Sequence, residues 1–368
     1  MQRITLLLSF IAALFITACA DKDPVILAPE PQLPAQLANY ENPEITESFW
    51  IDEARYKVTD EGASLGRVLF YDKILSKTNR VSCGSCHAQA AGFADPVPFS
   101  EGVNGDLLSR HTPSIANAYD DAFLFWDGRS GSLEDLALRP VRNHKEMGID
   151  ETEFIIAKVE KASYYDDLFT AAYGDNKVTE ERIADAMAQF ISSMISGQSK
   201  FDKVNAGLAQ YTDLEMMGQS TFFGEGRCYQ CHSGLDFNSR GFFFGGPNGG
   251  EWESTANIGL DVVYADNGAG ELDPERLGEF KIPTLRNIAR TAPYMHDGRF
   301  ASLSDVINHY NNNIADHPNL AQELRDWETD GAIALGLDEV QVQSLIAFLN
   351  TLTDEAYLSD PKFSDPFE

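Results

Sequence analysis

The chain has 368 residues, of which 43% are hydrophobic, so it is long enough for two domains and apolar enough to bury their cores. These values exclude a disordered chain. Its 57 acidic and 28 basic residues give a net charge of −29, and the sequence has no basic patch, which argues against nucleic-acid binding. An acidic surface can instead attract a basic protein partner such as a small cytochrome c, or it can serve solubility alone.

The first residues predict an exported protein. A short basic start, an apolar run from Ile4 to Ile16 and the small residues before Cys19 are typical of a signal peptide over residues 1–18. This run is too short to span a bilayer once it is cleaved. The segment ending at Cys19 resembles the lipobox of bacterial lipoproteins, which implies that Cys19 is lipidated. The alternative is an ordinary signal peptide with a bystander cysteine.

The residues after Cys19 predict where the protein is held. Ala20, rather than the aspartate associated with inner-membrane retention, favours an outer-membrane anchor that faces the periplasm. Residues 19–45 include several prolines, which is typical of an extended tether between the lipid and the globular part.

Two copies of the pattern C-x-x-C-H give the strongest chemical signal in the chain. This pattern is the attachment signature of c-type haem, in which both thiols bind the haem covalently and the histidine is the proximal iron ligand. A zinc site or a thioredoxin-like pair would not explain a histidine directly after the second cysteine in both copies. With Cys19, the motifs use all five cysteines, so none is left for a disulfide. The predicted haem-binding residues are Cys83, Cys86, His87, Cys228, Cys231 and His232.

Helical patterns precede both motifs. Leu65, Leu69 and Phe70 have helical spacing before the first motif, and Thr212 opens a capping box with Glu215 before the second. These two segments form the one large internal similarity that we find in the sequence.

The clearest helices are Thr179–Ile195, which begins at a threonine cap, and Asp338–Leu352. The stretch Asn238–Gly278 is rich in Gly, Asn and Asp and predicts a long loop. The predicted fold class is therefore mostly α, with two c-type cytochrome domains at residues 46–200 and 201–368, each binding one covalent haem, and with long loops.

The residues around the motifs resemble the bacterial di-haem cytochrome c peroxidases, a superfamily that includes the MauG-like enzymes. The likeness runs from about Leu65 to the C-terminus, and the order and spacing of several short stretches make it specific. These stretches are residues 65–72, Arg110-His111-Thr112-Pro113, Phe125-Trp126-Asp127-Gly128-Arg129, Glu146-Met147-Gly148, residues 280–287 and Ala292-Pro293-Tyr294-Met295-His296-Asp297-Gly298.

The resemblance implies unequal haems. The N-terminal haem would be the peroxide site, and the C-terminal haem would store and relay electrons. Glu146 matches the distal acid, which can accept a proton from peroxide and return it to the leaving oxygen. Trp126 matches the aromatic residue between the haems, which would relay electrons or simply fill the core. Where the family often has a glutamine, ten residues before Glu146, this chain has Leu136.

The sixth ligand of the second haem is the most discriminating position. The nearby candidates are Met295, His296, His309 and Tyr310. In typical peroxidases of the family the ligand is a methionine fourteen residues after the histidine that corresponds to His296. Tyr310 stands there in this chain, as a tyrosine does in MauG-like proteins. We expect Tyr310 to ligate the iron; the alternative is that Tyr310 only packs and Met295 is the ligand.

The family also holds a calcium ion between its domains, through an asparagine and two backbone carbonyls. The carbonyls correspond to Thr291 and Pro293, but the asparagine is replaced by His111, and imidazole is a poor ligand for this cation. Relatives that need reductive activation have a distal histidine before Arg110, and residues 95–109 contain none. His111 and His144 are alternative distal groups, or polar loop residues.

The leading functional hypothesis is a lipid-anchored, periplasmic di-haem peroxidase that reduces hydrogen peroxide with electrons from a small cytochrome c or a similar donor. A second hypothesis is a MauG-like oxidase that uses high-valent iron on a protein or small-molecule substrate. A third is a non-catalytic di-haem electron carrier. The resemblance also implies a homodimer, since relatives are often dimers.

Overall fold

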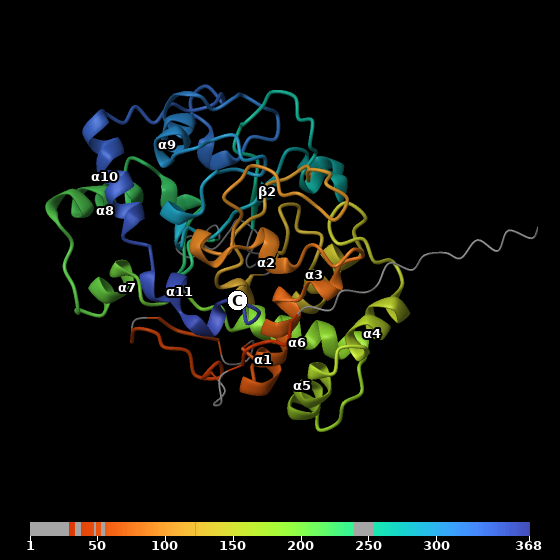
Figure 1. Ribbon diagram of the computed structural model, residues 1–368. Coiled ribbons are helices and arrows are strands. Elements are labelled where there is room, and N and C mark those ends of the chain that lie inside the picture. Colours follow the sequence, from red (N-terminus) through yellow and green to blue (C-terminus); the bar gives the residue numbers. More distant parts are fainter. Residues whose placement is uncertain (1–28, 34–37, 48, 53–55, 122, 239–253) are drawn as a thin grey trace, which may run out of the picture.

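The computed structural model describes residues 29–33, 38–47, 49–52, 56–121, 123–238 and 254–368. The predicted signal peptide and Cys19 lie outside these residues. Within them, no helix combines the length and the apolar character needed to cross a membrane. Helices dominate, as predicted, and Figure 1 shows them in two groups joined by long loops.

The first group packs around the helix pair α1 (Asp60–Tyr71) and α6 (Glu180–Ser192). Thr59 and Thr179 cap these helices with their side-chain oxygens, which satisfies amide groups that a helix start leaves free. Gly66 allows the close crossing, because a Cβ at this position would lie 1.9 Å from the Ala186 carbonyl oxygen. The group is completed by α3 (Leu133–Arg142), α4 (Thr152–Glu160) and α5 (Tyr164–Tyr173).

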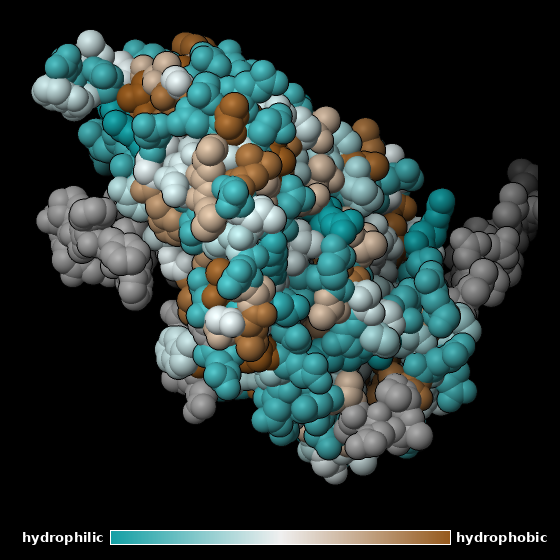
Figure 2. All heavy atoms as spheres, turned by 90° about the vertical axis from the view of Figure 1, so that its left-hand side faces the viewer, coloured by the Kyte–Doolittle hydropathy of each residue, from teal (hydrophilic) through white to brown (hydrophobic). Residues whose placement is uncertain are grey.

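The second group repeats this arrangement around α8 (Asp213–Phe223) and α10 (Glu339–Asn350). The predicted capping box of Thr212 and Glu215 is present at the start of α8. Gly218 is the counterpart of Gly66, because its Cβ would lie 1.9 Å from the Ser344 carbonyl oxygen. The remaining helices are α7 (Lys200–Asn205) and α9 (Leu303–Asn312). Figure 2 shows a largely hydrophilic face on the side of α8 and α10, with small apolar patches.

A longer repeat relates residues 112–143 to residues 282–313, in which residue n matches residue n + 170. Both segments contain a turn at an asparagine, then an Asp-Gly-Arg turn, then a serine-capped helix, which is α3 in one and α9 in the other. Asn117 and Asn287 have left-handed backbones with φ values of 58° and 60°. The sequence analysis missed this repeat, although its identical Asp-Gly-Arg and Ser-Leu-x-Asp letters could have revealed it.

The C-terminal tail returns to the first group of helices. Tyr357 of α11 (Glu355–Ser359) and Phe363, which follows this helix, pack in the same core cluster as Phe70 and Phe93. The Tyr71 hydroxyl donates to the Phe363 carbonyl oxygen at 2.6 Å. In Figure 1 the end of the chain accordingly lies beside α1 and α6. The first core therefore contains residues beyond the predicted boundary at residue 200.

Two expectations for irregular segments need correction. Tyr40 lies in the predicted tether but is 1% exposed, and its hydroxyl donates to the Lys362 carbonyl oxygen, so the globular part begins before residue 46. The predicted loop at 238–278 contains β1 (Thr255–Ala256), which pairs antiparallel with β2 (Phe280–Lys281). The partner strand follows the loop, so a local pattern gave no signal for this pairing. Residues 239–253 of the loop lie outside the described residues.

Candidate functional site

The two motif histidines are held in the same way. The Nδ1 atom of His87 lies 2.7 Å from the Phe93 carbonyl oxygen, and that of His232 lies 2.8 Å from the Phe237 carbonyl oxygen. A carbonyl only accepts, so each Nδ1 carries the proton and donates it. Each Nε2 is then left as a lone-pair donor, which is the form that binds iron.

The first cysteine pair forms the short helix α2 (Cys83–Cys86), which begins with a capping box between Ser82 and Ser85. Gly84 is required within it, because a Cβ there would lie 2.4 Å from the Tyr71 ring. Burial raises the pKa of Cys83 to about 12, with the neighbouring Cys86 as the next cause. Both thiols are therefore protonated at neutral pH.

The second pair begins in the 3-10 turn Cys228–Gln230, where burial raises the pKa of Cys228 to about 12. In both halves, two thiols and one properly oriented imidazole thus come from a single turn of chain. The donor sets fit covalently attached haem.

A largely apolar cavity lies against the first motif. Helices α1, α3 and α6 contribute to its walls, together with the turn that carries Glu146. Its lining includes Phe70, Cys83, Cys86, His87, Leu108, Leu136, Pro140, Glu146, Met147 and Met187. Glu146 is thereby in the same cavity as His87.

Glu146 is held by the turn that ends α3. The Asn143 carbonyl oxygen accepts from the Glu146 amide at 2.9 Å, and the Asn143 side-chain amide donates to Glu146 Oε1 at 2.6 Å. Burial raises the pKa of Glu146, while the Asn143 hydrogen bond and the Arg129 charge oppose the rise. A half-buried carboxylate with an elevated pKa in a cavity is suited to proton transfer.

The repeat places residues of different chemistry at one position. Pro140 of α3 lines the cavity beside the first motif, and its counterpart in α9 is Tyr310. Tyr310 packs against the same apolar cluster as Cys231, and its pKa is raised by burial and then by the neighbouring Cys231 and Cys228. A proline has no atom that can bind iron, whereas a phenol has one.

Trp126 lies between the two halves. Its indole Nε1 donates to the His111 carbonyl oxygen at 2.7 Å, and its own carbonyl oxygen accepts from the Lys281 amide at 2.7 Å. Trp126 also borders a cleft lined by residues of both halves, including Arg110, Lys281 and His296. It is 9% exposed and is therefore both a core residue and a bridge.

Comparisons with known proteins identify the architecture. Residues 60–210 match the family model of the di-haem cytochrome c peroxidases. The chain is 32% identical to the cytochrome c551 peroxidase of Nitrosomonas europaea, covering 80% of each chain. It is 30% identical to the methylamine utilization protein MauG of Methylorubrum extorquens, covering 81% of this chain and 80% of that one. The chain belongs to the di-haem cytochrome c peroxidase family.

Among solved structures, this family member is similar to a MauG-like protein associated with microbial copper homeostasis. The TM-score is 0.74 at 30% identity, over 95% of this chain and 99% of that one. A haem-dependent oxidoreductase is thus the class of enzyme to which the chain belongs.

The other histidines that sequence reasoning considered are engaged elsewhere. His144 is exposed and lies 3.3 Å from Asp150 on the surface. His309 Nε2 lies 2.9 Å from the Ile258 carbonyl oxygen, and His296 stacks on Phe280 with ring centroids 3.7 Å apart. His111 lies 3.1 Å from the Val97 carbonyl oxygen through Nδ1. Of the two histidine candidates for the second iron, His309 thus has its Nε2 in a hydrogen bond, whereas the buried Nδ1 of His296 has no hydrogen-bond partner within the described residues.

The donors expected to hold calcium fit that ion poorly. Calcium prefers six to eight oxygen ligands, usually with carboxylates among them. Here the corresponding side chain is the imidazole of His111, which faces the Val97 carbonyl oxygen. Thr291 turns its hydroxyl to the Ile288 carbonyl oxygen, and the described residues contain no cluster of acidic, histidine or cysteine side chains arranged to hold a metal ion.

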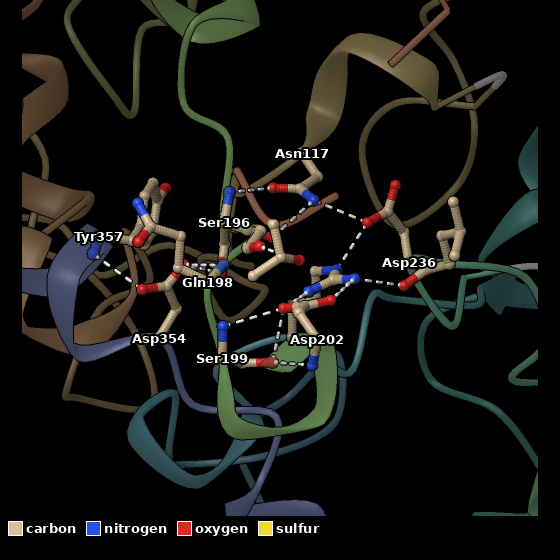
Figure 3. A network of polar contacts seen from close by, with 12 residues as sticks. Asn117, Ser196, Gln198, Ser199, Asp202, Asp236, Asp354 and Tyr357 are labelled. Atoms are coloured by element: carbon tan, nitrogen blue, oxygen red, sulfur yellow. Dashed lines mark hydrogen bonds and ion pairs between the residues drawn. The ribbon is translucent and has the colours of Figure 1, made fainter. Parts of the chain in front are cut away.

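A buried polar network joins the two halves beside the second motif (Figure 3), and the sequence analysis did not predict it. Arg286 is fully buried and pairs with Asp202 at 2.9 Å and with Asp236 at 2.8 Å. The Asn117 side chain donates to Asp236 at 2.6 Å, which adds a residue of the first half. Arg286 follows Pro283 in a stretch that the family shares. That resemblance was the one available sequence signal for this buried network.

Proposed function

We propose that the protein is a di-haem c-type peroxidase that reduces hydrogen peroxide to water with electrons from a cytochrome c or a similar donor. Cys83, Cys86 and His87 would hold one covalent haem, and Cys228, Cys231 and His232 would hold the other. The haems supply the redox-active iron. The observation that carries the proposal is Glu146, a half-buried carboxylate in the cavity of His87.

Glu146 serves as the proton carrier at the first site. Its carboxylate accepts a proton from the incoming peroxide and returns it to the oxygen that leaves as water, so the proton balance at this residue is zero. The reduction takes two electrons and two protons from outside for each peroxide. Leu108, Leu136 and Met147 make much of the cavity wall around Glu146 apolar.

The second half serves as the electron entrance. A cytochrome c delivers one electron at a time, so a second redox centre is needed to supply two. Trp126 lies on a hydrogen-bonded path between the halves, since its indole donates to the His111 carbonyl oxygen and its own carbonyl oxygen accepts from the Lys281 amide. We assign it the relay role. The donor would be basic, because the chain has a net charge of −29.

The position of Tyr310 supports a second candidate, a MauG-like oxidase that acts on a protein or a small molecule. Tyr310 is the counterpart of Pro140 and packs against the same apolar cluster as Cys231, which supports it as the sixth ligand. Met295 remains the alternative ligand, and a non-catalytic electron carrier remains the third hypothesis. The carrier would need a sixth ligand at both irons, and Pro140 cannot provide one.

The remaining assignments concern the setting of the enzyme. We place it in the periplasm, anchored through Cys19 to the outer membrane, with a homodimer as the oligomeric state to be tested. Bound calcium at the Thr291 and Pro293 carbonyls is not part of the proposal, because the donor set there is a poor match.

Three measurements on the purified holoprotein test these proposals. The ferric spectrum should contain one high-spin and one low-spin haem, and two low-spin haems indifferent to peroxide would leave only the carrier hypothesis. Peroxide turnover with reduced cytochrome c should fall by about 100-fold or more in Glu146→Gln. Unchanged turnover would remove Glu146 from the mechanism. Tyr310→Phe should alter the low-spin spectrum, and an unaltered one would refute Tyr310 as the ligand.

A further inference from the structure

The turn after α3 is organised by a single residue, Asn143. Its amide donates to the Arg139 carbonyl oxygen and so ends the helix, while its carbonyl oxygen accepts from the amides of Glu146 and Gly148. Its side-chain oxygen accepts from the Lys145 amide at 3.0 Å. These bonds use every polar group of Asn143 except the side-chain NH₂, which is directed at Glu146 Oε1 at 2.6 Å.

The internal repeat shows how much of this arrangement the fold itself requires. The counterpart of Asn143 is Asn313, which ends α9 by donating its amide to the His309 carbonyl oxygen. Its side chain donates to the Asn308 carbonyl oxygen at 3.1 Å. The counterpart of Glu146 is Asp316, which is 65% exposed and lies 3.9 Å from Arg325. The helix can therefore end at this asparagine without a bond from its side chain to a carboxylate.

The two residues also differ in what they border. Both residues line an outer hollow between α3 and α6 and the cleft between the halves, which His87 also borders, whereas only Glu146 lines the apolar cavity beside the first cysteine pair. The Asn143 amide therefore binds one oxygen of the carboxylate at the edge of that cavity. In the described part of the chain, Asn143 is the one side chain that donates a hydrogen bond to Glu146.

We propose that Asn143 is a positioning residue that fixes the Glu146 carboxylate for proton transfer. It leaves Oε2 as the oxygen that exchanges a proton with the substrate. Leu136 has no polar atom to offer in the same cavity, so the orientation of Glu146 depends on the turn that carries it. The inference rests on the proposed peroxidase function and adds a residue to it.

Asn143→Asp separates the two roles of the side chain. An aspartate keeps an oxygen to accept from the Lys145 amide and keeps the helix end, but it cannot donate to Glu146 when ionised. Asn313→Asp is the matched control, since it makes the same change at the same place in the other half. The rate constant for the spectral change on adding peroxide is measured by stopped flow, with the ferric spectrum and the melting temperature of each holoprotein.

We expect Asn143→Asp to react about tenfold more slowly or worse, with an unchanged ferric spectrum, and Asn313→Asp to react within about twofold of the wild-type rate. In the Glu146→Gln background, Asn143→Asp should add no further loss, because residues that act as a unit are not additive. A wild-type rate in Asn143→Asp, or additive losses in the double variant, would overturn the inference. The proposed function would still stand in that case if the Glu146→Gln variant is slow. A wild-type rate in Glu146→Gln would overturn both.

Discussion

Asn117 and Asn287 hold the same residue, Ser196, from opposite halves of the molecule. Asn117 Oδ1 accepts from the Ser196 amide at 2.7 Å, and Asn287 Nδ2 donates to the Ser196 hydroxyl at 3.0 Å. Figure 3 shows Ser196 beside Asn117 in the connection between α6 and α7. The two asparagines correspond in the internal repeat, so the connection passes between equivalent turns. The halves are thereby fixed to one another through a buried polar contact rather than through a flexible linker.

Arg286→Met should destabilise the protein strongly. The substitution removes the buried guanidinium group, which is the cationic partner of the Asp202 and Asp236 carboxylates. The expected loss in the free energy of unfolding is about 3–5 kcal/mol, read from chemical denaturation of the holoprotein. The control is Arg290→Met, whose pair with Glu355 is about half exposed and should be worth less than about 1 kcal/mol. Equal losses in the two variants would contradict the prediction.

Gly66→Ala and Gly218→Ala should each loosen a helix crossing. Alanine favours a helix over glycine by about 1 kcal/mol, but each new methyl group would lie 1.9 Å from a carbonyl oxygen. The helices must move apart, so we expect a net loss of about 1–3 kcal/mol and a lower melting temperature. Gly131→Ala is the matched control, because no atom lies within 4 Å of its Cβ. A stabilised Gly66→Ala protein would refute the crossing geometry.

The peroxide reaction should lose rate in acid at a higher pH than an exposed glutamate would cause. Burial raises the pKa of Glu146, and the base form is the one that accepts the proton, so the rate declines as the pH falls through this raised value. The Asn143 hydrogen bond and the charge of Arg129 limit the rise. Stopped-flow rates measured between about pH 4 and pH 8 define this acidic decline in rate, which Glu146→Gln should abolish. An identical decline in that variant would assign the titration to another group.

Trp126→Phe should slow the passage of electrons between the halves. Phenylalanine fills the apolar site but lacks the N–H that donates to the His111 carbonyl oxygen, at a cost in stability of about 1 kcal/mol. Donor-driven turnover should fall while the direct reaction with peroxide is retained. Trp50→Phe provides the control, since Trp50 is 67% exposed. Wild-type turnover in Trp126→Phe would limit that residue to packing.

The sequence was informative wherever the signal is local. The motif spacing identified His87 and His232 as candidate ligands, and the caps at Thr179 and Thr212 located helix starts correctly, because each rests on a few neighbouring residues. Arg286 could not be interpreted in this way. Its partner Asp202 is 84 positions away, so a charged residue in the core became intelligible only in the folded chain.

The candidate site shows the same difference between what the sequence signals and what only the folded chain reveals. The family register singled out Glu146 and Tyr310, but the residue that orients Glu146 was not foreseen, since Asn143 appears in the sequence as an ordinary helix end. The same applies to Pro140. Its importance arises from a comparison with Tyr310, and that comparison depends on the repeat that relates α3 to α9, whose shared letters were readable in the sequence but were not used.

The return of the tail to the first core also sets the order in which the protein can mature. Tyr357 and Phe363 are among the last residues to be synthesised, yet they complete the apolar cluster that covers Phe70 and Phe93 beside the first cysteine pair. The apolar cluster of the N-terminal half is therefore complete only when the last residues of the chain have docked. A protein truncated before residue 355 would lose the support of its first haem site rather than of its second.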